Sequence, residues 1–264
     1  MFKFNTAAGE ASPAAFAGEQ LEIRVKGLVK SFGRTIILNG VDLAVSKGEA
    51  VALVGSNGAG KSTFLRCLLR LIEPSDGTVE MGGVDVMSMG RSSLRKLRSQ
   101  IGFVFQKHNL VPRLTALTNV LHGAQSRKRG PRVWWHMLAT DGERQEAMRC
   151  LQLVGLSHVA EQRVDQLSGG QSQRVAIARA LMQRPRIMFA DEPVASLDPN
   201  AGEEVMRLFV ELIRSRGLTL VYTSHSVRHA LEYSDRVIGL RAGRIEMDSA
   251  SSDLNQETLR RIYG

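Results

Sequence analysis

Long hydrophobic runs are absent from the sequence. Its longest apolar stretches, such as Ala50–Val54, have the length of a strand, whereas a helix that crosses a bilayer needs about 20 apolar residues. The first residues form a mild Ala, Gly, Ser and Pro stretch without the apolar segment of a secretory signal. We therefore expect neither a membrane-spanning helix nor an export signal, and a protein that stays in the cytoplasm.

Cysteine is scarce as well. The two cysteines, Cys67 and Cys150, lie far apart in helix-like segments, which excludes the dense disulfide framework of a small secreted domain. We expect both to be buried, reduced thiols. His225 and His229 have a spacing that could suggest a metal pair, but no third ligand is evident, so we expect no zinc-type site.

Negative charge is outweighed by positive charge, with 35 Lys and Arg against 26 Asp and Glu and a net charge of +9. Nucleic-acid binding, a membrane-facing surface with phosphate ligands, and a solvated basic surface are all compatible with this excess. The densest basic cluster comprises residues 127–129 and Arg132. Charge alone does not choose among these interpretations, and a solvated surface is the default.

Strand and helix patterns alternate along most of the 264 residues, which implies a parallel sheet with helices on its faces. A helical block at about 107–165 interrupts the alternation and predicts a separate helical lobe. Val41, Leu43 and Val45 should share one face of their strand. We predict a flexible lead-in over 1–20, a turn at 74–77, strands at 21–25, 36–45, 50–54, 78–81, 101–105, 187–190, 218–223 and 236–240, and helices at 61–71, 170–183, 202–215, from 227 and at 254–262.

A glycine-rich segment between a buried strand and a helix fits the phosphate-loop pattern G-x-x-x-x-G-K-[ST] at every required position. Its glycines allow backbone N–H groups to surround a phosphate, and the helix N-terminus adds partial positive charge. Lys61 would bind the β- and γ-phosphates, and Ser62 would bind Mg²⁺. The nucleotide-binding residues expected here are Gly55, Ser56, Asn57, Gly58, Ala59, Gly60, Lys61, Ser62 and Thr63.

Two acids follow the apolar strand at 187–190. The strand would deliver both carboxylates to the carboxyl edge of the sheet, where α/β folds bind ligands. Asp191 would hold Mg²⁺, and Glu192 would polarise the attacking water as general base. A strand followed by Asp and Glu is by itself weak evidence for a catalytic site. The phosphate loop earlier in the sequence makes that evidence strong.

Residues 167–171 read Leu-Ser-Gly-Gly-Gln, about 20 residues before the acidic strand end. This segment matches the signature of ATP-binding cassettes, and the chain resembles that family over about 21–250. A serine hydroxyl and glycine N–H groups at a helix N-terminus form a second anion site. The resemblance implies an α/β fold: a P-loop cassette with a RecA-like parallel-sheet core, an antiparallel β subdomain, a helical subdomain at about 107–183, and a C-terminal helix at 251–264.

Further residues acquire roles from the resemblance. Gln106 is similar to the Q-loop glutamine, which senses Mg²⁺ and couples to the membrane subunit. Asp198 resembles the D-loop aspartate, which links two active sites across a dimer. His225 resembles the switch histidine that contacts the γ-phosphate. Phe32 stands where the family has an aromatic that stacks on adenine, although a core aromatic in a strand is the alternative.

Two positions depart from the usual pattern of the family. Ser172 follows the signature where Gln is more usual; it lies outside the glycine contact, so we expect little effect. Ser226 follows the switch histidine where many importers have Gln or Glu.

In this family one chain does not bring its own signature to its own phosphate loop. The resemblance therefore implies a head-to-tail homodimer in which each ATP lies between Lys61 of one copy and the signature residues of the other. The signature residues expected to contact nucleotide are Ser168, Gly169, Gly170 and Gln171.

Finer features resemble the ATPases of phosphonate importers: residues 109–115, 118–124, 132–138 with Trp134 and Trp135, and 190–198. Near relatives carry phosphite or hypophosphite, and importers of amino acids or lipoproteins are the broader alternative. The implied partners are two permease subunits and a periplasmic substrate-binding protein, at the cytoplasmic face of the bacterial inner membrane. A nucleic-acid-acting ATPase is the rival class, but no nucleic acid is expected. The two tryptophans could face the permease or lie in the lobe core.

Overall fold

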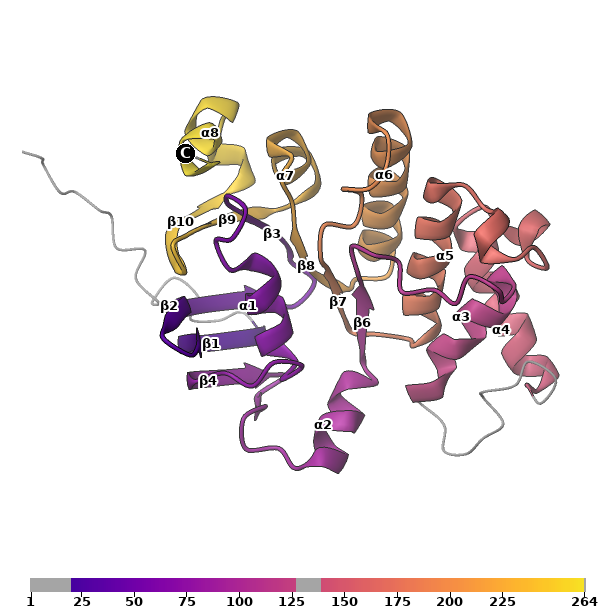
Figure 1. The fold of residues 1–264 in the computed structure, drawn as a ribbon, viewed down its shortest axis with the longest axis horizontal. Helices are drawn as coiled ribbons and strands as arrows, with labels where there is room; N and C mark the ends of the chain where they lie inside the picture. Colours follow the sequence, from indigo (N-terminus) through magenta and orange to yellow (C-terminus); the bar gives the residue numbers. More distant parts are fainter. Residues whose placement is uncertain (1–19, 127–138, 264) are drawn as a thin grey trace, which may run out of the picture.

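A six-stranded sheet forms the centre of the molecule (Figure 1). The structure, a computed structural model, describes residues 20–126 and 139–263. The strands of this sheet are β3 (Ala50–Val54), β6 (Ile101–Val104), β7 (Ile187–Ala190), β8 (Thr219–Thr223), β9 (Arg236–Arg241) and β10 (Arg244–Ala250). They follow the order β10-β9-β3-β8-β7-β6, and every neighbouring pair is parallel except β9 with β10.

Both faces of the parallel strands are buried, which explains why these strands are apolar throughout. All five residues of β3 are buried. Val51 and Leu53 belong to one hydrophobic cluster, whereas Ala52 and Val54 belong to the other. Because successive side chains in a strand point to opposite faces, the sheet separates two cores.

The first core is closed by a four-stranded antiparallel sheet and by helix α1 (Lys61–Leu68), whose Phe64 and Leu65 are buried. The predicted shared face of Val41, Leu43 and Val45 is confirmed, since all three are buried. The strands of this sheet, in the order β2-β1-β4-β5, are β2 (Thr35–Ser46), β1 (Leu21–Phe32), β4 (Asp76–Met81) and β5 (Val84–Asp85).

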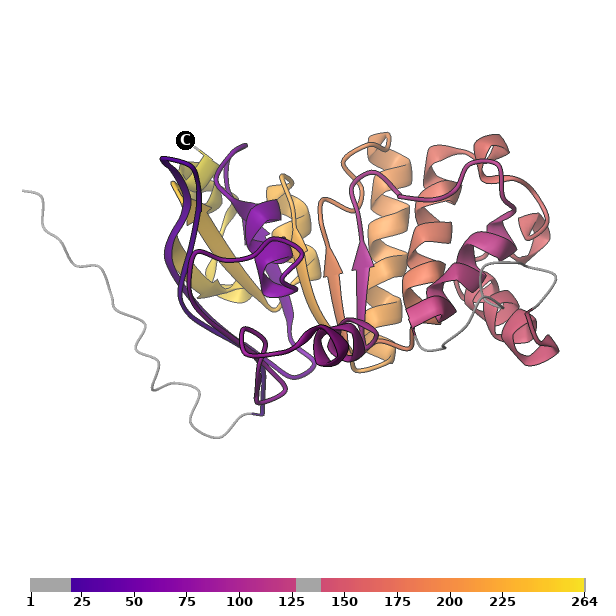
Figure 2. The same ribbon diagram turned by 60° about the horizontal axis from the view of Figure 1, so that its bottom comes forward.

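The second core is closed by helices. Helix α6 (Pro199–Ser215) covers the sheet, and a helical lobe lies at the end of the long axis opposite the antiparallel sheet (Figures 1 and 2). The lobe contains α3 (Ala116–Leu121), η2 (His122–Ser126), α4 (Asp141–Leu153), η5 (Ser157–Val159), η6 (Val164–Gln166) and α5 (Gly169–Met182). Helices α7 (Val227–Tyr233) and α8 (Gln256–Tyr263) contact each other near β9.

Several boundaries differ from the prediction. Helix α6 begins at Pro199 rather than at residue 202, because the Asp198 side chain caps it and proline suits the first helical position. The predicted turn at 74–77 is wrong in its second half, since β4 already begins at Asp76 and pairs with β1. Helix α2 (Arg91–Arg98) and strand β10 were not predicted.

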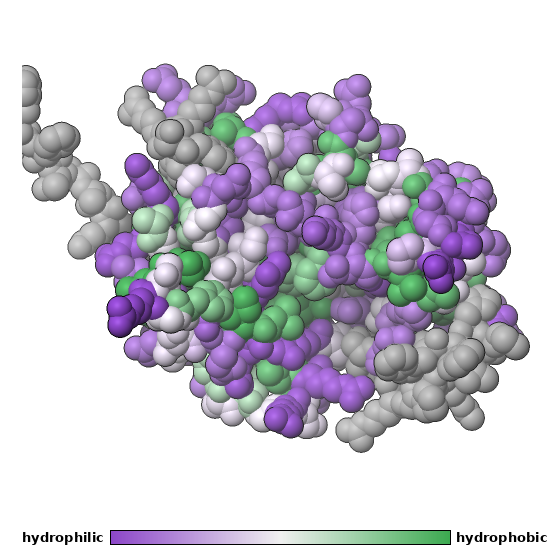
Figure 3. All heavy atoms as spheres, in the orientation of Figure 1, coloured by the Kyte–Doolittle hydropathy of each residue, from purple (hydrophilic) through white to green (hydrophobic). Residues whose placement is uncertain are grey.

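Hydrophilic residues cover most of the face that Figure 3 shows, and hydrophobic residues form smaller patches on it. Among the described residues, no helix combines the length and the apolar character that crossing a membrane requires. Cys67 and Cys150 are both buried thiols, as predicted. The predictions for three segments lie outside the described residues: the basic cluster at 127–129 and 132, the two tryptophans at 134 and 135, and all but the last residue of the lead-in over 1–20.

Candidate active site

The phosphate loop joins the carboxyl end of β3 to the first turn of α1. Gly55 has φ 149, and a Cβ there would lie 2.1 Å from the carbonyl oxygen of Leu240, so only glycine fits. The Lys61 ammonium folds back into the loop and donates to the carbonyl oxygens of Gly55 at 2.8 Å and Ser56 at 3.1 Å. The loop thus surrounds a cation at the N-terminus of a helix.

This loop encloses a pocket of about 270 Å³. Lys61 is 5% exposed, and burial lowers the pKa of its ammonium, an effect that the nearby Glu192 and Asp191 oppose. A buried ammonium beside a helix N-terminus attracts an anion, which would relieve its desolvation. The residues that line the pocket are Ile37, Asn57, Gly58, Ala59, Gly60, Lys61, Ser62, Thr63 and Glu192.

Asp191 lies at the carboxyl end of β7 and is 2% exposed. Its Oδ1 accepts hydrogen bonds from the hydroxyls of Ser62 at 2.7 Å and Thr223 at 3.0 Å, and its Oδ2 lies 3.7 Å from the Arg66 guanidinium. The sheet therefore places the carboxylate directly beside the phosphate loop. Ser62 and Asp191 together offer hard oxygen donors, the kind that Mg²⁺ prefers beside phosphate groups, so these residues fit that ion.

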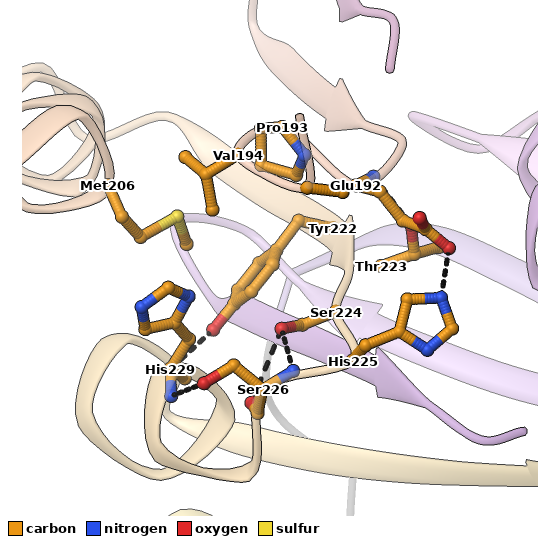
Figure 4. A pocket seen from close by; sticks show the side chains of 11 residues that line it. Glu192, Pro193, Val194, Met206, Tyr222, Thr223, Ser224, His225, Ser226 and His229 are labelled. Atoms are coloured by element: carbon orange, nitrogen blue, oxygen red, sulfur yellow. Dashed lines mark hydrogen bonds and ion pairs between the residues drawn. The ribbon is translucent and has the colours of Figure 1, made fainter. Parts of the chain in front are cut away.

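Glu192 adopts a left-handed backbone conformation, with φ 49. Its N–H donates to the Thr223 hydroxyl at 2.8 Å, and its carboxylate accepts from Gln106 Nε2 at 3.0 Å and contacts His225 Nε2 (Figure 4). This conformation is unfavourable for a residue that carries a Cβ, and such residues cluster at functional sites. The bend turns Glu192 away from Asp191 and toward Gln106 and His225.

Three of the expected catalytic side chains therefore meet at one point. Gln106 follows β6, Glu192 follows β7 and His225 follows β8. These strands are neighbours in the parallel sheet, so their carboxyl ends share one edge. A second pocket of about 170 Å³ lies beside His225 and Glu192.

The signature residues and Asp198 lie elsewhere. Ser168 and Gln171 form a reciprocal capping box at the N-terminus of α5, at 3.2 Å and 2.9 Å, and both Ser168 and Gly169 are exposed. Asp198 is exposed and caps α6 by accepting from Ala201 N–H at 3.0 Å. These described residues do not line the phosphate-loop pocket. Figure 1 shows α5 and α1 on opposite sides of the central strands.

Phe32 lies at the end of β1 and is 51% exposed, which excludes the interpretation as a core aromatic. Lys30 Nζ lies 4.6 Å from its ring centroid. Its exposed ring can stack on a planar ligand. Phe32 does not line the phosphate-loop pocket, however, whereas Ile37 does.

Sequence reasoning missed Thr223, Arg66 and Ile37. Thr223 contacts both acids, and its position at the end of a parallel strand was the available signal. Arg66 lies one helical turn after Ser62, which would have indicated a shared face. Among residues 20–126 and 139–263, no three His, Cys, Asp or Glu side chains form a group that could hold a metal ion.

Solved structures share this fold. The dimeric structure of MJ0796, a bacterial ABC transporter cassette, has a TM-score of 0.77 and 36% identity, and the match covers 87% of this chain and 98% of that one. The dimeric post-hydrolysis structure of the same cassette, bound to ADP and Pi, has a TM-score of 0.76 and 35% identity, with the same coverage.

Sequence comparison agrees. The ABC transporter family model matches residues 38–195. The phosphonates import ATP-binding protein PhnC of Wolinella succinogenes is 43% identical over 92% of this chain and 88% of its own length. The protein of the same name from Frankia casuarinae is 46% identical over 91% and 95%, respectively. This chain therefore belongs to the ABC transporter family and has the fold of an ATP-binding cassette.

Proposed function

We propose that this chain is the ATP-hydrolysing subunit of a bacterial ABC importer of phosphonates. One observation carries the hydrolytic part: the phosphate loop, an oxygen pair suited to Mg²⁺, and the cluster of Gln106, Glu192 and His225 occupy one edge of one sheet. The names of relatives that match over about nine-tenths of the chain support the substrate class.

ATP would bind with its phosphates in the loop pocket. Backbone N–H groups of the loop would surround the β- and γ-phosphates, and Lys61 would turn from the carbonyl oxygens of Gly55 and Ser56 to the phosphate oxygens. The exposed ring of Phe32 would stack on the adenine. Ser62, Asp191 and Gln106 would hold Mg²⁺, which neutralises phosphate charge when bound.

Hydrolysis would depend on Glu192. Its carboxylate would accept a proton from water while the water oxygen attacks the γ-phosphorus and the bond to the bridging oxygen of ADP breaks. His225, which contacts Glu192 here, would hold the γ-phosphate. Gln106 would orient the same water and ion from the other side.

A second copy of the chain would complete each site. The signature helix N-terminus is exposed and lies apart from the phosphate-loop pocket of its own chain, so it is free to face the γ-phosphate held by another copy. Ser168, Gly169, Gly170 and Gln171 would then contact nucleotide across a head-to-tail dimer, and Asp198 would link the two sites. Both sites of a homodimer would be competent.

The complete importer would contain two permease subunits and a periplasmic substrate-binding protein, with this chain at the cytoplasmic face of the inner membrane. A surface near 106–124 would receive the permease. The chain has no evident part in substrate choice, so phosphite, hypophosphite or another small solute is the alternative cargo.

Growth on single phosphorus sources tests the proposal. A strain lacking the gene would be grown on phosphate, a phosphonate, phosphite or hypophosphite, and complemented with the wild type or with Glu192→Gln. We expect loss of growth on the phosphonate and rescue only by the wild type. Loss confined to phosphite or hypophosphite would reassign the cargo. Normal growth on all four sources, with other uptake systems removed, would contradict the substrate class and leave the ATPase assignment standing.

A further inference from the structure

A cluster of polar side chains joins α6 to α7 one helical turn after His225. Its centre is Glu203 on α6. Glu203 Oε2 accepts from His229 Nε2 at 3.1 Å and contacts Arg228 Nη2, and Glu203 Oε1 accepts from the Tyr233 hydroxyl. One carboxylate thus holds three side chains of a seven-residue helix.

The cluster is partly withdrawn from water. The side chain of His229 is 12% exposed and that of Glu203 is 29% exposed. The Tyr233 hydroxyl, by donating to the carboxylate, lowers the pKa of Glu203, and desolvation opposes this effect while His229 and Arg228 add to it. Burial and Glu203 together raise the pKa of Tyr233. The carboxylate is therefore ionised at neutral pH, and Tyr233 keeps its proton as donor.

The cluster is connected to His225 along both directions of the chain. Before His225, the buried Tyr222 of β8 donates from its hydroxyl to the His229 carbonyl at 2.9 Å. After it, the Ser226 hydroxyl caps α7 by accepting from His229 N–H at 3.2 Å. Figure 4 shows His225 and His229 on either side of the Ser224–Ser226 segment.

Apolar packing is incomplete on one side of the Ser224–Ser226 segment. The pocket of about 170 Å³ lies between it and the side chains of Val194 and Met206, so the loop that carries His225 is unsupported there by apolar contact (Figure 4). Helix α7 itself packs on the core through Ala230 and Tyr233, and the hydrogen bonds of Glu203 tie it to α6. Asp198 caps α6, so the same helix carries Asp198 at its N-terminus and Glu203 in its first two turns.

We propose that Glu203 is a positioning residue for His225: through His229, Arg228 and Tyr233 it fixes α7 against α6 and so keeps His225 in contact with Glu192. The inference rests on the proposed function, because it assumes that His225 serves ATP hydrolysis.

The test compares Glu203→Ala and Glu203→Gln with Glu211→Ala, which removes an exposed carboxylate from the same helix. We expect Glu203→Ala to lower kcat for ATP by about tenfold with KM changed less than about twofold, because only a transition-state contact is weakened. Glutamine keeps one acceptor oxygen but places an amide NH2 where the second carboxylate oxygen accepted, so Glu203→Gln should recover only part of kcat. Glu211→Ala should match the wild type.

An independent readout uses the nucleotide-free protein. The ¹⁵N resonances of the His225 ring, assigned with His225→Gln, should move in Glu203→Ala and stay in place in Glu211→Ala. If Glu203→Ala folds poorly, Tyr233→Phe takes its place. This variant keeps the ring and removes one hydrogen bond to Glu203, so it should shift the His225 resonances by a smaller amount. Unchanged His225 resonances and an unchanged kcat in folded variants would overturn the proposal. A wild type that hydrolyses no ATP would instead overturn the proposed function, while the resonances still test the positioning.

Discussion

At the scale of single residues, the adjacent acids Asp191 and Glu192 have different surroundings. Asp191 is buried and accepts from Ser62 and Thr223, whereas Glu192 is turned by its left-handed backbone toward Gln106 and His225. Strand β7 ends at Ala190, so the left-handed conformation of Glu192, and not the alternation of a strand, sets the direction of its side chain. One acid is thereby suited to an ion and the other to a water molecule.

Much of this cluster was predictable from the sequence. Ser62 and Asp191 are 129 residues apart, yet both follow parallel strands, so the sheet rule places them together. Thr223 was not predictable in the same way, because a threonine at a strand end carries neither charge nor motif. The contact between Glu192 and His225 depends on a backbone bend that no residue pattern announces.

Cys67 provides a pH test of burial at the residue scale. Burial raises the pKa of its thiol from 9.0 to about 11. Because the folded protein favours the protonated thiol, this contribution to stability is complete below the unfolded pKa and is lost as pH rises toward the folded pKa. We expect the free energy of unfolding to fall by up to about 1.4 kcal/mol per pH unit within that window.

Urea denaturation measures this effect, with Cys67→Ala as the control. Between about pH 8 and about pH 10.5 the wild type should lose more stability than the variant, although its stability at the lower pH is greater. Parallel pH curves for the two proteins would show that the thiol is not shielded as described.

At the scale of elements, the misses have physical causes. Helix α2 buries only Leu94 and Leu97, so its apolar periodicity is weak. Strand β10 follows a turn in which Ala242 and Gly243 both have positive φ. Such turns usually carry Asn-Gly or Asp-Gly, so the Ala-Gly pair gave no clear hairpin signal. The buried strands β3, β7 and β8 were predictable, because both of their faces are apolar.

Two glycines in the helical lobe should respond in opposite directions to substitution by alanine. A Cβ on Gly123 of η2 would lie 2.2 Å from the carbonyl oxygen of Arg179 in α5, whereas a Cβ on Gly142 of α4 meets nothing within 4 Å. We expect Gly123→Ala to lower stability by about 1–3 kcal/mol through overpacking. Gly142→Ala should raise it by about 0.5–1 kcal/mol through reduced backbone entropy.

Thermal or urea unfolding of the two variants checks this contrast, since each serves as the control for the other. A Gly123→Ala protein as stable as the wild type would mean that η2 does not approach α5 as closely as the structure has it.

At the scale of the whole molecule, the phosphate loop and the signature helix belong to different parts of one chain. The phosphate loop lies between the two sheets, and the signature begins α5 in the helical lobe. The layer order was predictable from the alternation of strands and helices. The separation of the two anion sites was expected only from the family resemblance, because it depends on how the lobe is placed against the sheet.

This separation makes the proposed dimer the central question. The most direct measurement is the mass of Glu192→Gln in solution, by light scattering, with and without ATP and Mg²⁺. We predict the mass of a monomer without nucleotide and the mass of a dimer, with ATP retained, when ATP and Mg²⁺ are present. Adding Ser168→Glu to the same protein should prevent dimer formation, because it places negative charge where the γ-phosphate would bind. A Glu192→Gln protein that stays monomeric at saturating ATP, or that hydrolyses ATP at the wild-type rate, would contradict the proposed composite site.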